Sequence, residues 1–332
     1  MKNIYITDYF TDSKIEKKIF GNSAKVICLS KENRSKFSEK ISKADGLLVW
    51  HAQIDQKLIK LMKNCKVIVR YGVGYDNIDI NEAKKNNIIC LNTPDYGIDE
   101  VADTAVSMIL SFTRKTNYYN ESCKNYKNIW QENVLKENLA NPIKRSDDIV
   151  IGIIGFGRIG SSIAKRLKPF GFKIGFFDPY LPSGYEKVHD VIKFNTLNDL
   201  LKNSNIISIN SHLNKKTNSL INRKFIMKMK KNSVLINTAR GKIVNKLDDL
   251  YFGLKSGILS GVGLDVLPEE PPNIKEKLIK SWKNKKDPIS NKIIINPHAG
   301  YFSTKSVIEM REKASLNLKN ALFKNIFVNK IN

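Results

Sequence analysis

Short runs rich in Ile and Val alternate with longer, lysine-rich segments of helical period along the chain. Strands and helices that alternate in this way build parallel sheets, because each helix returns the chain to the same end of the sheet before the next strand begins. We therefore predict an α/β protein made of repeated β-α units. In the N-terminal part, strands are expected over residues 3–7, 25–29, 46–50, 66–69 and 88–91, with helices over 55–62 and 80–85.

A second series of apolar runs predicts strands over residues 149–154, 173–177, 206–209, 233–236, 262–264 and 292–295. Residues 99–114 have acidic side chains in a first turn and apolar residues at helical spacing, which favours a long helix. A helix is also expected over residues 303–327. The 332 residues suggest two domains, at roughly 150 residues per domain. We expect two doubly wound domains, each built on a parallel sheet.

Composition excludes several classes of protein. Hydrophobic residues make up 42% of the chain and charged residues 27%, which is too apolar for a disordered chain. The longest apolar run, residues 149–156, is far shorter than the roughly 18 residues of a membrane helix, and Asp8 lies where a signal peptide would be apolar. We expect a cytoplasmic protein with no membrane partner. The four cysteines show no CxxC or CxxH spacing, so neither a disulfide nor a metal site is predicted.

The formal net charge is +24, from 56 Lys and Arg against 32 Asp and Glu. A basic surface concentrates phosphate-bearing molecules, so this charge could indicate a nucleic-acid partner. Lysines are, however, scattered through every segment beside a heavy use of Asn and Ile, as a genome-wide codon bias would produce. Because no recognisable nucleic-acid-binding motif accompanies the charge, we favour the compositional explanation and expect no nucleic-acid partner.

A glycine-rich motif directly follows the most apolar predicted strand and consists of Gly155, Phe156, Gly157, Arg158, Ile159 and Gly160. The first glycine permits a tight turn, the second lets the backbone approach a pyrophosphate, and the third lets the following helix pack on the strand. The next predicted strand ends at Asp178, 18 residues after Gly160. An acid at this place binds both ribose hydroxyls and repels a 2′-phosphate. The motif therefore predicts a site for NAD rather than NADP.

Ligands of open α/β sheets bind at the carboxyl ends of the strands. The predicted strand ends carry Arg70 with Gly72-Val73-Gly74, Asp178, Asn210-Ser211-His212, Thr238-Ala239-Arg240-Gly241, Asp265 and Pro297-His298. Oxidation of a secondary alcohol needs a base on its hydroxyl, and an imidazole titrating near neutral pH suits this task, which makes His298 the candidate. Arg240 offers a planar fork of donors for a carboxylate and a carbonyl. Glu270, which precedes two prolines, could hydrogen-bond the imidazole.

Each of these residues also has an ordinary structural explanation. A His after a strand often belongs to a turn, an Arg before a Gly often forms a surface ion pair, and Glu269 and Glu270 could simply be solvated. His51 and His212 end predicted strands and could line the same cleft.

Five stretches of the sequence occur in the order found in one enzyme family. They are residues 70–79 (RYGVGYDNID), 155–160 (GFGRIG), 237–241 (NTARG), 264–271 (LDVLPEEP) and 296–299 (NPHA). Together they resemble the D-isomer-specific 2-hydroxyacid dehydrogenases over nearly the whole chain. Within that family, Trp50-His51, Asn92-Thr93-Pro94, Asp178-Pro179-Tyr180 and the segment from His298 to Tyr301 look most like the C-terminal-binding-protein branch, with phosphoglycerate dehydrogenases next.

The resemblance implies a discontinuous, flavodoxin-like substrate-binding domain over residues 1–99 and 299–332, and a Rossmann NAD-binding domain over residues 100–298. It makes Arg240, Glu270 and His298 the catalytic set; Glu270 is chosen because the family's acid stands immediately before the proline. It also implies a homodimer. The implied activity is NAD-dependent hydride transfer between nicotinamide and a D-2-hydroxy acid or 2-keto acid; the alternative is an NAD(H)-sensing, corepressor-like scaffold with little turnover.

The resemblance also assigns ligand contacts, with the substrate carboxylate on the Val73 and Gly74 amides and the nicotinamide near Thr238. The candidate cofactor-binding residues are Gly155, Phe156, Gly157, Arg158, Ile159, Gly160, Asp178, Asn210, Ser211, His212, Thr217, Thr238, Ala239, Arg240, Asp265, His298 and Gly300. The candidate substrate-binding residues are His51, Arg70, Val73, Gly74 and Tyr301. Three positions depart from the family pattern. Asn210 stands where the family commonly has His, and His212 stands where it usually has a small residue or Pro. Tyr301 stands where the most similar branch tends to have Trp.

Overall fold

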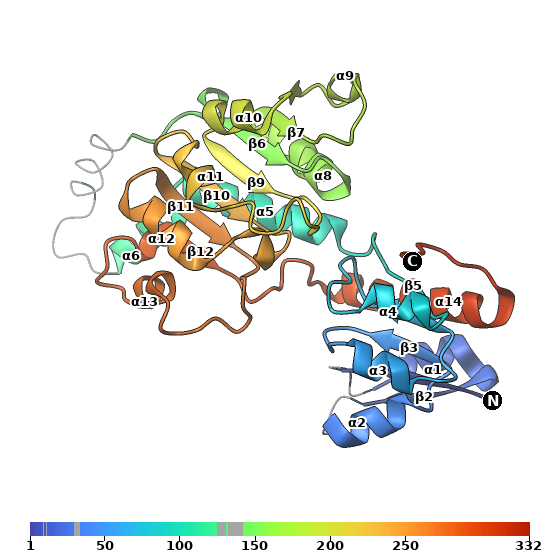
Figure 1. Cartoon of the computed structure of the whole chain (residues 1–332). Coiled ribbons are helices and arrows are strands. Elements are labelled where there is room, and N and C mark those ends of the chain that lie inside the picture. Colours follow the sequence, from blue (N-terminus) through green and yellow to red (C-terminus); the bar gives the residue numbers. More distant parts are fainter. Residues whose placement is uncertain (9, 11, 30–33, 125–130, 132–141) are drawn as a thin grey trace. The chain divides into compact units, whose positions relative to one another are not determined.

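The computed structural model describes residues 1–332 apart from 9, 11, 30–33, 125–130 and 132–141 (Figure 1). The chain forms two compact units, one made of Met1–Gly97 with Phe302–Asn332 and the other of Ile98–Tyr301. Each unit contains one sheet, and neighbouring strands in both sheets are parallel. The predicted α/β architecture with two doubly wound sheets is confirmed. Within the described residues, no helix combines the length and the apolar character needed to cross a membrane.

The first unit has a five-stranded sheet in the order β2-β1-β3-β4-β5, which is the flavodoxin-like order. Its strands are β1 (Lys2–Ile6), β2 (Ala24–Cys28), β3 (Gly46–Val49), β4 (Val67–Arg70) and β5 (Ile89–Leu91). Its helices are α1 (Lys14–Phe20), α2 (Arg34–Ile41), α3 (Gln56–Leu61), α4 (Ile80–Lys85) and α14 (Thr304–Lys324). All residues of β3 and β4 are buried, as expected for parallel strands covered on both faces.

Helix α14 completes the first unit, although it comes from the other end of the sequence. It packs against α1, β3 and β4. The buried guanidinium of Arg311 donates from Nε to Glu16 Oε1 at 2.8 Å and from Nη2 to Glu16 Oε2 at 2.7 Å. Tyr71 Oη donates to the same Glu16 Oε1 at 2.9 Å, and burial raises the pKa of Tyr71 well above its ordinary value. This bidentate pair ties α14 to α1 through the core.

The second unit has a seven-stranded sheet in the order β12-β11-β10-β9-β6-β7-β8. Its strands are β6 (Val150–Ile154), β7 (Lys173–Phe177), β8 (Ile192–Lys193), β9 (Ile206–Ile209), β10 (Ser233–Asn237), β11 (Leu259–Leu264) and β12 (Ile293–Ile295). Its helices include α5 (Ile98–Thr113), α6 (Thr116–Cys123), α8 (Arg158–Leu167), α9 (Tyr185–His189), α10 (Leu197–Asn203), α11 (Arg223–Met227), α12 (Leu247–Lys255) and α13 (Lys277–Lys283). The strand order reverses between β6 and β9, where a Rossmann fold binds its ligand.

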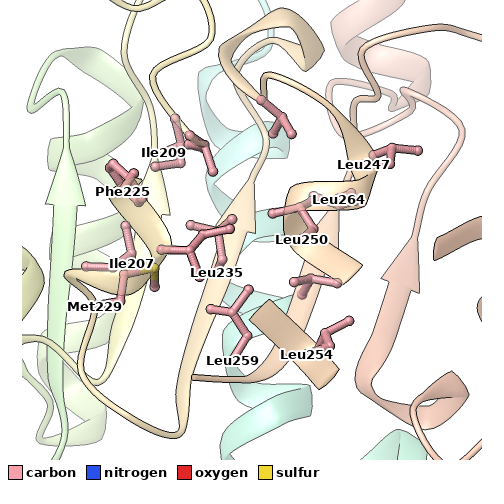
Figure 2. Close-up of a cluster of buried hydrophobic side chains, with 14 of the residues drawn as sticks. Ile207, Ile209, Phe225, Met229, Leu235, Leu247, Leu250, Leu254, Leu259 and Leu264 are labelled. Carbon is pink, nitrogen blue, oxygen red and sulfur yellow. The ribbon is translucent and has the colours of Figure 1, made fainter. Parts of the chain in front are cut away.

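Two hydrophobic clusters hold this second sheet. One packs strand residues such as Ile207 and Leu235 against α11 and α12, where Phe225 and Leu250 are buried (Figure 2). The other packs α5 and α8 on the opposite side of the sheet. Strand β11 begins three residues before the predicted start. The predicted strand was too short because Gly261 and Gly263 interrupt the apolar run. A side chain at Gly261 would meet the Phe112 ring at 2.6 Å, so these glycines let α5 approach the strand closely.

Candidate active site

The glycine motif forms the turn between β6 and α8. Gly155 has φ +86°, and a Cβ there would lie 2.7 Å from the backbone nitrogen of Ser211, in the loop after β9. A Cβ on Gly160 would lie 2.2 Å from the Gly155 carbonyl oxygen. A Cβ on Gly157, by contrast, would meet no atom of the described structure within 4 Å. The first and third glycines are therefore needed for packing, while the second leaves open space at the start of α8.

Three buried polar atoms lie on the loops after β9 and β10, at the same edge of the sheet as this turn. Asn210 Oδ1 and Ser211 Oγ follow β9, and Thr238 Oγ1 follows β10; none of the three has a hydrogen-bond partner within the part of the chain that the structure describes. Buried polar groups in proteins are normally hydrogen-bonded, so these atoms are placed to bind a ligand. Together with the open side of Gly157 and the amino end of α8, they fit a dinucleotide whose pyrophosphate lies over the turn.

Asp178 lies at the end of β7, directly beside the glycine turn. Its Oδ2 accepts the backbone N–H of Phe156 at 2.9 Å, and its Oδ1 accepts that of Tyr180 at 3.0 Å. These two bonds orient the carboxylate. In the loop after β9, Thr217 Oγ1 donates to the carbonyl of the exposed residue His212 at 2.6 Å, so Thr217 shapes the loop.

Two of the candidate catalytic side chains, on the loops after β11 and β12, contact each other. His298 Nδ1 lies 2.8 Å from Glu270 Oε2. The other carboxylate oxygen, Glu270 Oε1, accepts the backbone N–H of Leu267 at 2.8 Å. His298 has φ +54°, and its own N–H donates to the carbonyl of Asp265 at 2.8 Å. The imidazole and the carboxylate are thus both oriented by the backbone of neighbouring loops.

The Asp265 side chain holds the loop that carries His298. Its Oδ1 accepts the N–H groups of Ala299, at 3.1 Å, and of Gly300, at 2.9 Å. Burial raises the pKa of the Asp265 carboxyl, against the opposing effects of His298 and the two N–H donors. A Cβ on Gly300 would lie 2.6 Å from Asp265 Oδ2, so glycine is required there. The Tyr301 ring lies 6.5 Å from the His298 ring, centroid to centroid.

Arg240 belongs to a compact turn after β10. Asn237 Nδ2 donates to the Arg240 carbonyl at 3.0 Å, and Asn237 Oδ1 accepts the Ala239 N–H at 3.0 Å. Gly241 packs directly on the chain that leads to Glu270, since a Cβ there would lie 1.8 Å from the Leu267 carbonyl oxygen. The sequence analysis did not identify Asn237 or Gly241 as residues that shape the site, although both belong to the NTARG motif.

The remaining candidates lie in the first unit. Asn92 Nδ2 donates to the Val73 carbonyl at 2.7 Å, and the Thr93 N–H donates to the Gly72 carbonyl at 3.0 Å. Thr93 Oγ1 also donates to the carbonyl of Arg70 at 2.8 Å. The loop with the two candidate carboxylate-binding amides, those of Val73 and Gly74, is therefore fixed by the segment after β5.

His51 lies in a second loop of the first unit. Its N–H donates to Asp8 Oδ2 at 2.5 Å, and the Trp50 N–H donates to Asp8 Oδ1 at 3.1 Å. Asn77 Nδ2 donates to the carbonyls of Trp50 and Ala52 at 3.1 and 2.9 Å. The roles of Asp8, Asn77 and Asn92 could not be predicted from the sequence, because they depend on contacts between distant loops.

Comparison with known proteins decides the family. Residues 106–300 match the model of the D-isomer specific 2-hydroxyacid dehydrogenase NAD binding domain, which is more than half of the chain. The chain belongs to this family. The dehydrogenase is 33% identical over 289 residues to hydroxypyruvate reductase of Thermotoga maritima, with 86% of each chain covered. It is 34% identical over 287 residues to glyoxylate reductase of Thermococcus litoralis, which covers 84% of the dehydrogenase and 81% of the relative.

A solved structure supports the same assignment. The dehydrogenase is similar to D-lactate dehydrogenase from Aquifex aeolicus in complex with NAD and lactic acid, with a TM-score of 0.80, 26% identity and coverage of 99% and 100%. The predicted enzyme class is confirmed: the chain is an NAD(P)-dependent oxidoreductase of 2-hydroxy acids and 2-keto acids. The named relatives are hydroxypyruvate and glyoxylate reductases, so the comparisons support the family and not the branch that the motifs most resemble.

Proposed function

We propose that this dehydrogenase reduces small 2-keto acids of the glyoxylate and hydroxypyruvate type, with Arg240, Glu270 and His298 as its catalytic residues. The observation that carries the proposal is the 2.8 Å contact between His298 Nδ1 and Glu270 Oε2. The contact joins an imidazole and a carboxylate on the loops after β11 and β12, at the carboxyl edge of the sheet whose strand β6 leads into the glycine turn. This supports an acid-base role for the pair. When bound there, the nicotinamide cofactor supplies or accepts the hydride at the C2 atom of the substrate.

His298 is the proton carrier in this proposal. Because Glu270 engages Nδ1, the other ring nitrogen, Nε2, is the atom that exchanges a proton with the substrate oxygen. During reduction, Nε2 donates a proton as the carbonyl becomes a hydroxyl, and during oxidation it removes that proton. The negative charge of Glu270 favours the protonated imidazole that reduction requires.

In the second unit, Arg240 is the proposed ligand of the substrate's oxygen atoms. The Arg240 guanidinium donates to the carbonyl and carboxylate oxygens through two parallel N–H groups, which suits a 2-keto acid. In the first unit, the amides of Val73 and Gly74 are the candidate carboxylate-binding groups, and Arg70 adds positive charge. His51 in the first unit and Tyr301 in the second are further candidate substrate-binding residues.

A small substrate is supported by the relatives. The relatives that are 33% and 34% identical are named hydroxypyruvate reductase and glyoxylate reductase. Hydroxypyruvate and glyoxylate are keto acids with very small groups on C2. NADH rather than NADPH is supported by Asp178, whose carboxylate lies beside the glycine turn where a 2′-phosphate would be repelled. The remaining candidate cofactor residues lie on the same turn or on the loops after β9, β10, β11 and β12.

The two units have separate roles in this proposal. Residues 100–298 form the NAD-binding domain, and residues 1–99 with 299–332 form the substrate-binding domain. The family likeness also supports a homodimer, which light scattering of the purified protein would test.

A panel of 2-keto acids tests the proposed activity. NADH oxidation by the purified protein is expected to be fastest with glyoxylate or hydroxypyruvate, and slower with pyruvate and with branched 2-keto acids. A clear preference for a branched keto acid would refute the proposed substrate class. Tight NADH binding without turnover of any acid in the panel would instead favour the NAD(H)-sensing scaffold.

A further inference from the structure

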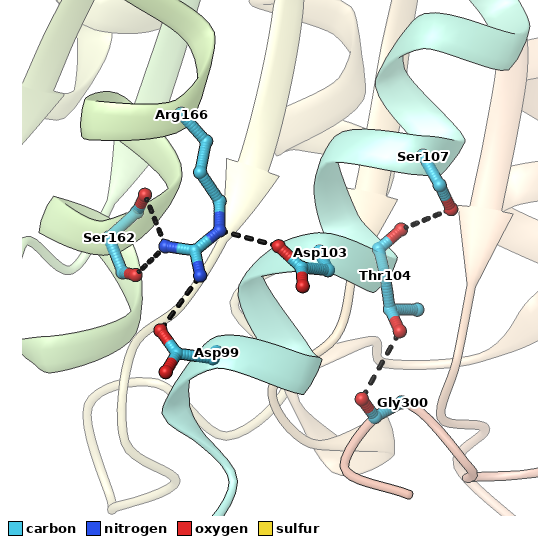
Figure 3. Close-up of polar contacts among 7 residues, drawn as sticks. All are labelled: Asp99, Asp103, Thr104, Ser107, Ser162, Arg166 and Gly300. Carbon is cyan, nitrogen blue, oxygen red and sulfur yellow. Dashed lines mark hydrogen bonds and ion pairs between the residues drawn. The ribbon is translucent and has the colours of Figure 1, made fainter. Parts of the chain in front are cut away.

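Helix α5 touches the loop that carries His298. Thr104 Oγ1, on the second turn of α5, donates a hydrogen bond to the Gly300 carbonyl at 3.1 Å (Figure 3). Gly300 is buried and lies two residues after His298. The two bonded residues are 196 positions apart in the sequence.

The Thr104 bond completes a clamp on this loop. Asp265 Oδ1 already accepts the N–H groups of Ala299 and Gly300. With Thr104 bound to the Gly300 carbonyl, both polar groups of that residue are held. His298 needs such support, because its φ of +54° lies in the left-handed region that side chains other than glycine rarely adopt.

Thr104 lies on a turn of α5 that is bound to helix α8. The preceding residue, Asp103, accepts a hydrogen bond from Arg166 Nε of helix α8 at 2.5 Å. Asp99 accepts a second hydrogen bond from Arg166 Nη2 at 2.7 Å (Figure 3). Arg166 also donates from Nη1 to the Ser162 carbonyl at 3.3 Å. The turn of α5 that reaches the His298 loop is thus the same turn that is bound to α8, the helix that begins in the glycine motif.

We propose that Thr104 is a positioning residue for the reaction, whose hydroxyl fixes the His298 loop from helix α5. The proposal rests on the proposed role of His298. If the Thr104 hydroxyl is removed, the Gly300 carbonyl loses its donor and the loop can shift. The 2.8 Å contact between His298 and Glu270 would then lengthen in part of the population. A displacement of about 1 Å at a reacting group can lower a rate by roughly a hundredfold.

The charged and titratable groups around His298 set the expected change in pH dependence. The Glu270 carboxylate contacts its Nδ1, the Asp265 carboxylate acts on it across the loop, and Tyr301 lies edge-on to its ring. Weakening the contact with Glu270 disfavours the protonated imidazole. On the alkaline side of the pH profile, the rate of keto acid reduction should therefore fall to half its maximum at a lower pH in the variant than in the wild type.

The test compares three variants in the full-length protein. Thr104→Val removes the donor and keeps the shape, and we expect kcat for keto acid reduction to fall roughly tenfold or more. The KM for NADH should stay within about twofold, because the glycine turn is untouched. Thr104→Ser keeps the hydroxyl and should restore both kcat and the pH profile. Ser107→Ala is the matched control. Ser107 Oγ donates to the Thr104 carbonyl within α5, at 3.0 Å, and its removal should not change the kinetics.

The His298→Ala variant separates this inference from the proposed function. Wild-type kcat and an unshifted pH profile in folded Thr104→Val, combined with loss of activity in His298→Ala, would overturn the role of Thr104 alone. Normal turnover by His298→Ala would overturn the proposed catalytic assignment itself. If Thr104→Val does not fold, Thr104→Ala gives the same test, because alanine favours a helix and equally lacks the donor.

Discussion

His298 Nδ1 lies 2.8 Å from Glu270 Oε2, while Glu270 Oε1 accepts the Leu267 N–H at the same distance. The backbone N–H of Leu267 thus orients the carboxylate that contacts the imidazole. In the proposed mechanism, this contact orients the ring, and the other ring nitrogen, Nε2, exchanges the proton.

Replacing His298 with Ala should abolish most of the turnover. The variant lacks the proton carrier, so kcat with the best keto acid should fall by roughly 10²- to 10⁴-fold. NADH binding, measured by its fluorescence, should remain close to that of the wild type, because the glycine turn is unchanged. A kcat within a few-fold of the wild type would contradict the assignment of His298.

Replacing Glu270 with Gln keeps the shape of the side chain and removes its charge. The protonated imidazole loses its stabilising neighbour, so the pH at which reduction falls to half its maximum should shift downward. A rate profile from about pH 5 to pH 9 with saturating NADH measures the shift. Glu269→Gln is the matched control, and its profile should overlay that of the wild type; equal shifts in both variants would point to a general charge effect.

Replacing Asp178 with Asn should narrow the proposed preference for NADH over NADPH. The change removes a negative charge from the position expected to face the 2′-phosphate of NADPH. Loss of a like-charge repulsion of about 1 kcal/mol should raise kcat/KM for NADPH roughly fivefold. Because Asp178 also accepts the Phe156 N–H, NADH binding should weaken somewhat as well. Asp190→Asn changes an exposed acid that pairs with Lys168, and it should leave the NADH to NADPH ratio unchanged.

Replacing Arg311 with Met should destabilise the protein strongly. It leaves the fully buried Glu16 carboxylate without its cationic partner, a change that costs about 3–5 kcal/mol in comparable buried pairs. Lys313→Met on the same helix breaks ion pairs with Asp95 and Glu309 that are more exposed, and should cost no more than about 1 kcal/mol. Urea unfolding of both variants measures the difference. Equal decreases in the free energy of unfolding would show that the buried Arg311 pair contributes no more to stability than the exposed Lys313 pairs.

Features set by local sequence were predictable. The glycine motif, its flanking strands and Asp178 lie within one β-α-β segment, so their spacing alone predicts that they lie together. The contact between Glu270 and His298 links neighbouring strand ends, and the order of parallel strands made it a reasonable hypothesis. By contrast, the two-residue strand β8 carries no apolar run from which it could have been predicted.

Contacts between distant segments could not be predicted from patterns. The bond from Thr104 to Gly300 joins a helix and a loop that are 196 positions apart, and Thr104 belongs to none of the recognised motifs. Asp8 holds the backbone of residues 50–52 from more than 40 positions away, and a lone aspartate after a strand gives no sign of such a role. These partners depend on tertiary packing, which a single sequence does not display.

The return of α14 to the first unit affects how the chain must fold as it is made. Glu16 and Arg311 are 295 residues apart, so at a synthesis rate of roughly 5–20 residues per second the ribosome adds the arginine about 15–60 s after the glutamate. During that interval the nascent first sheet lacks the helix that covers it, whereas Ile98–Tyr301 is contiguous and can fold as soon as it emerges. A chain that terminates before α14 should therefore yield a folded nucleotide-binding half beside an incomplete, chaperone-dependent first half.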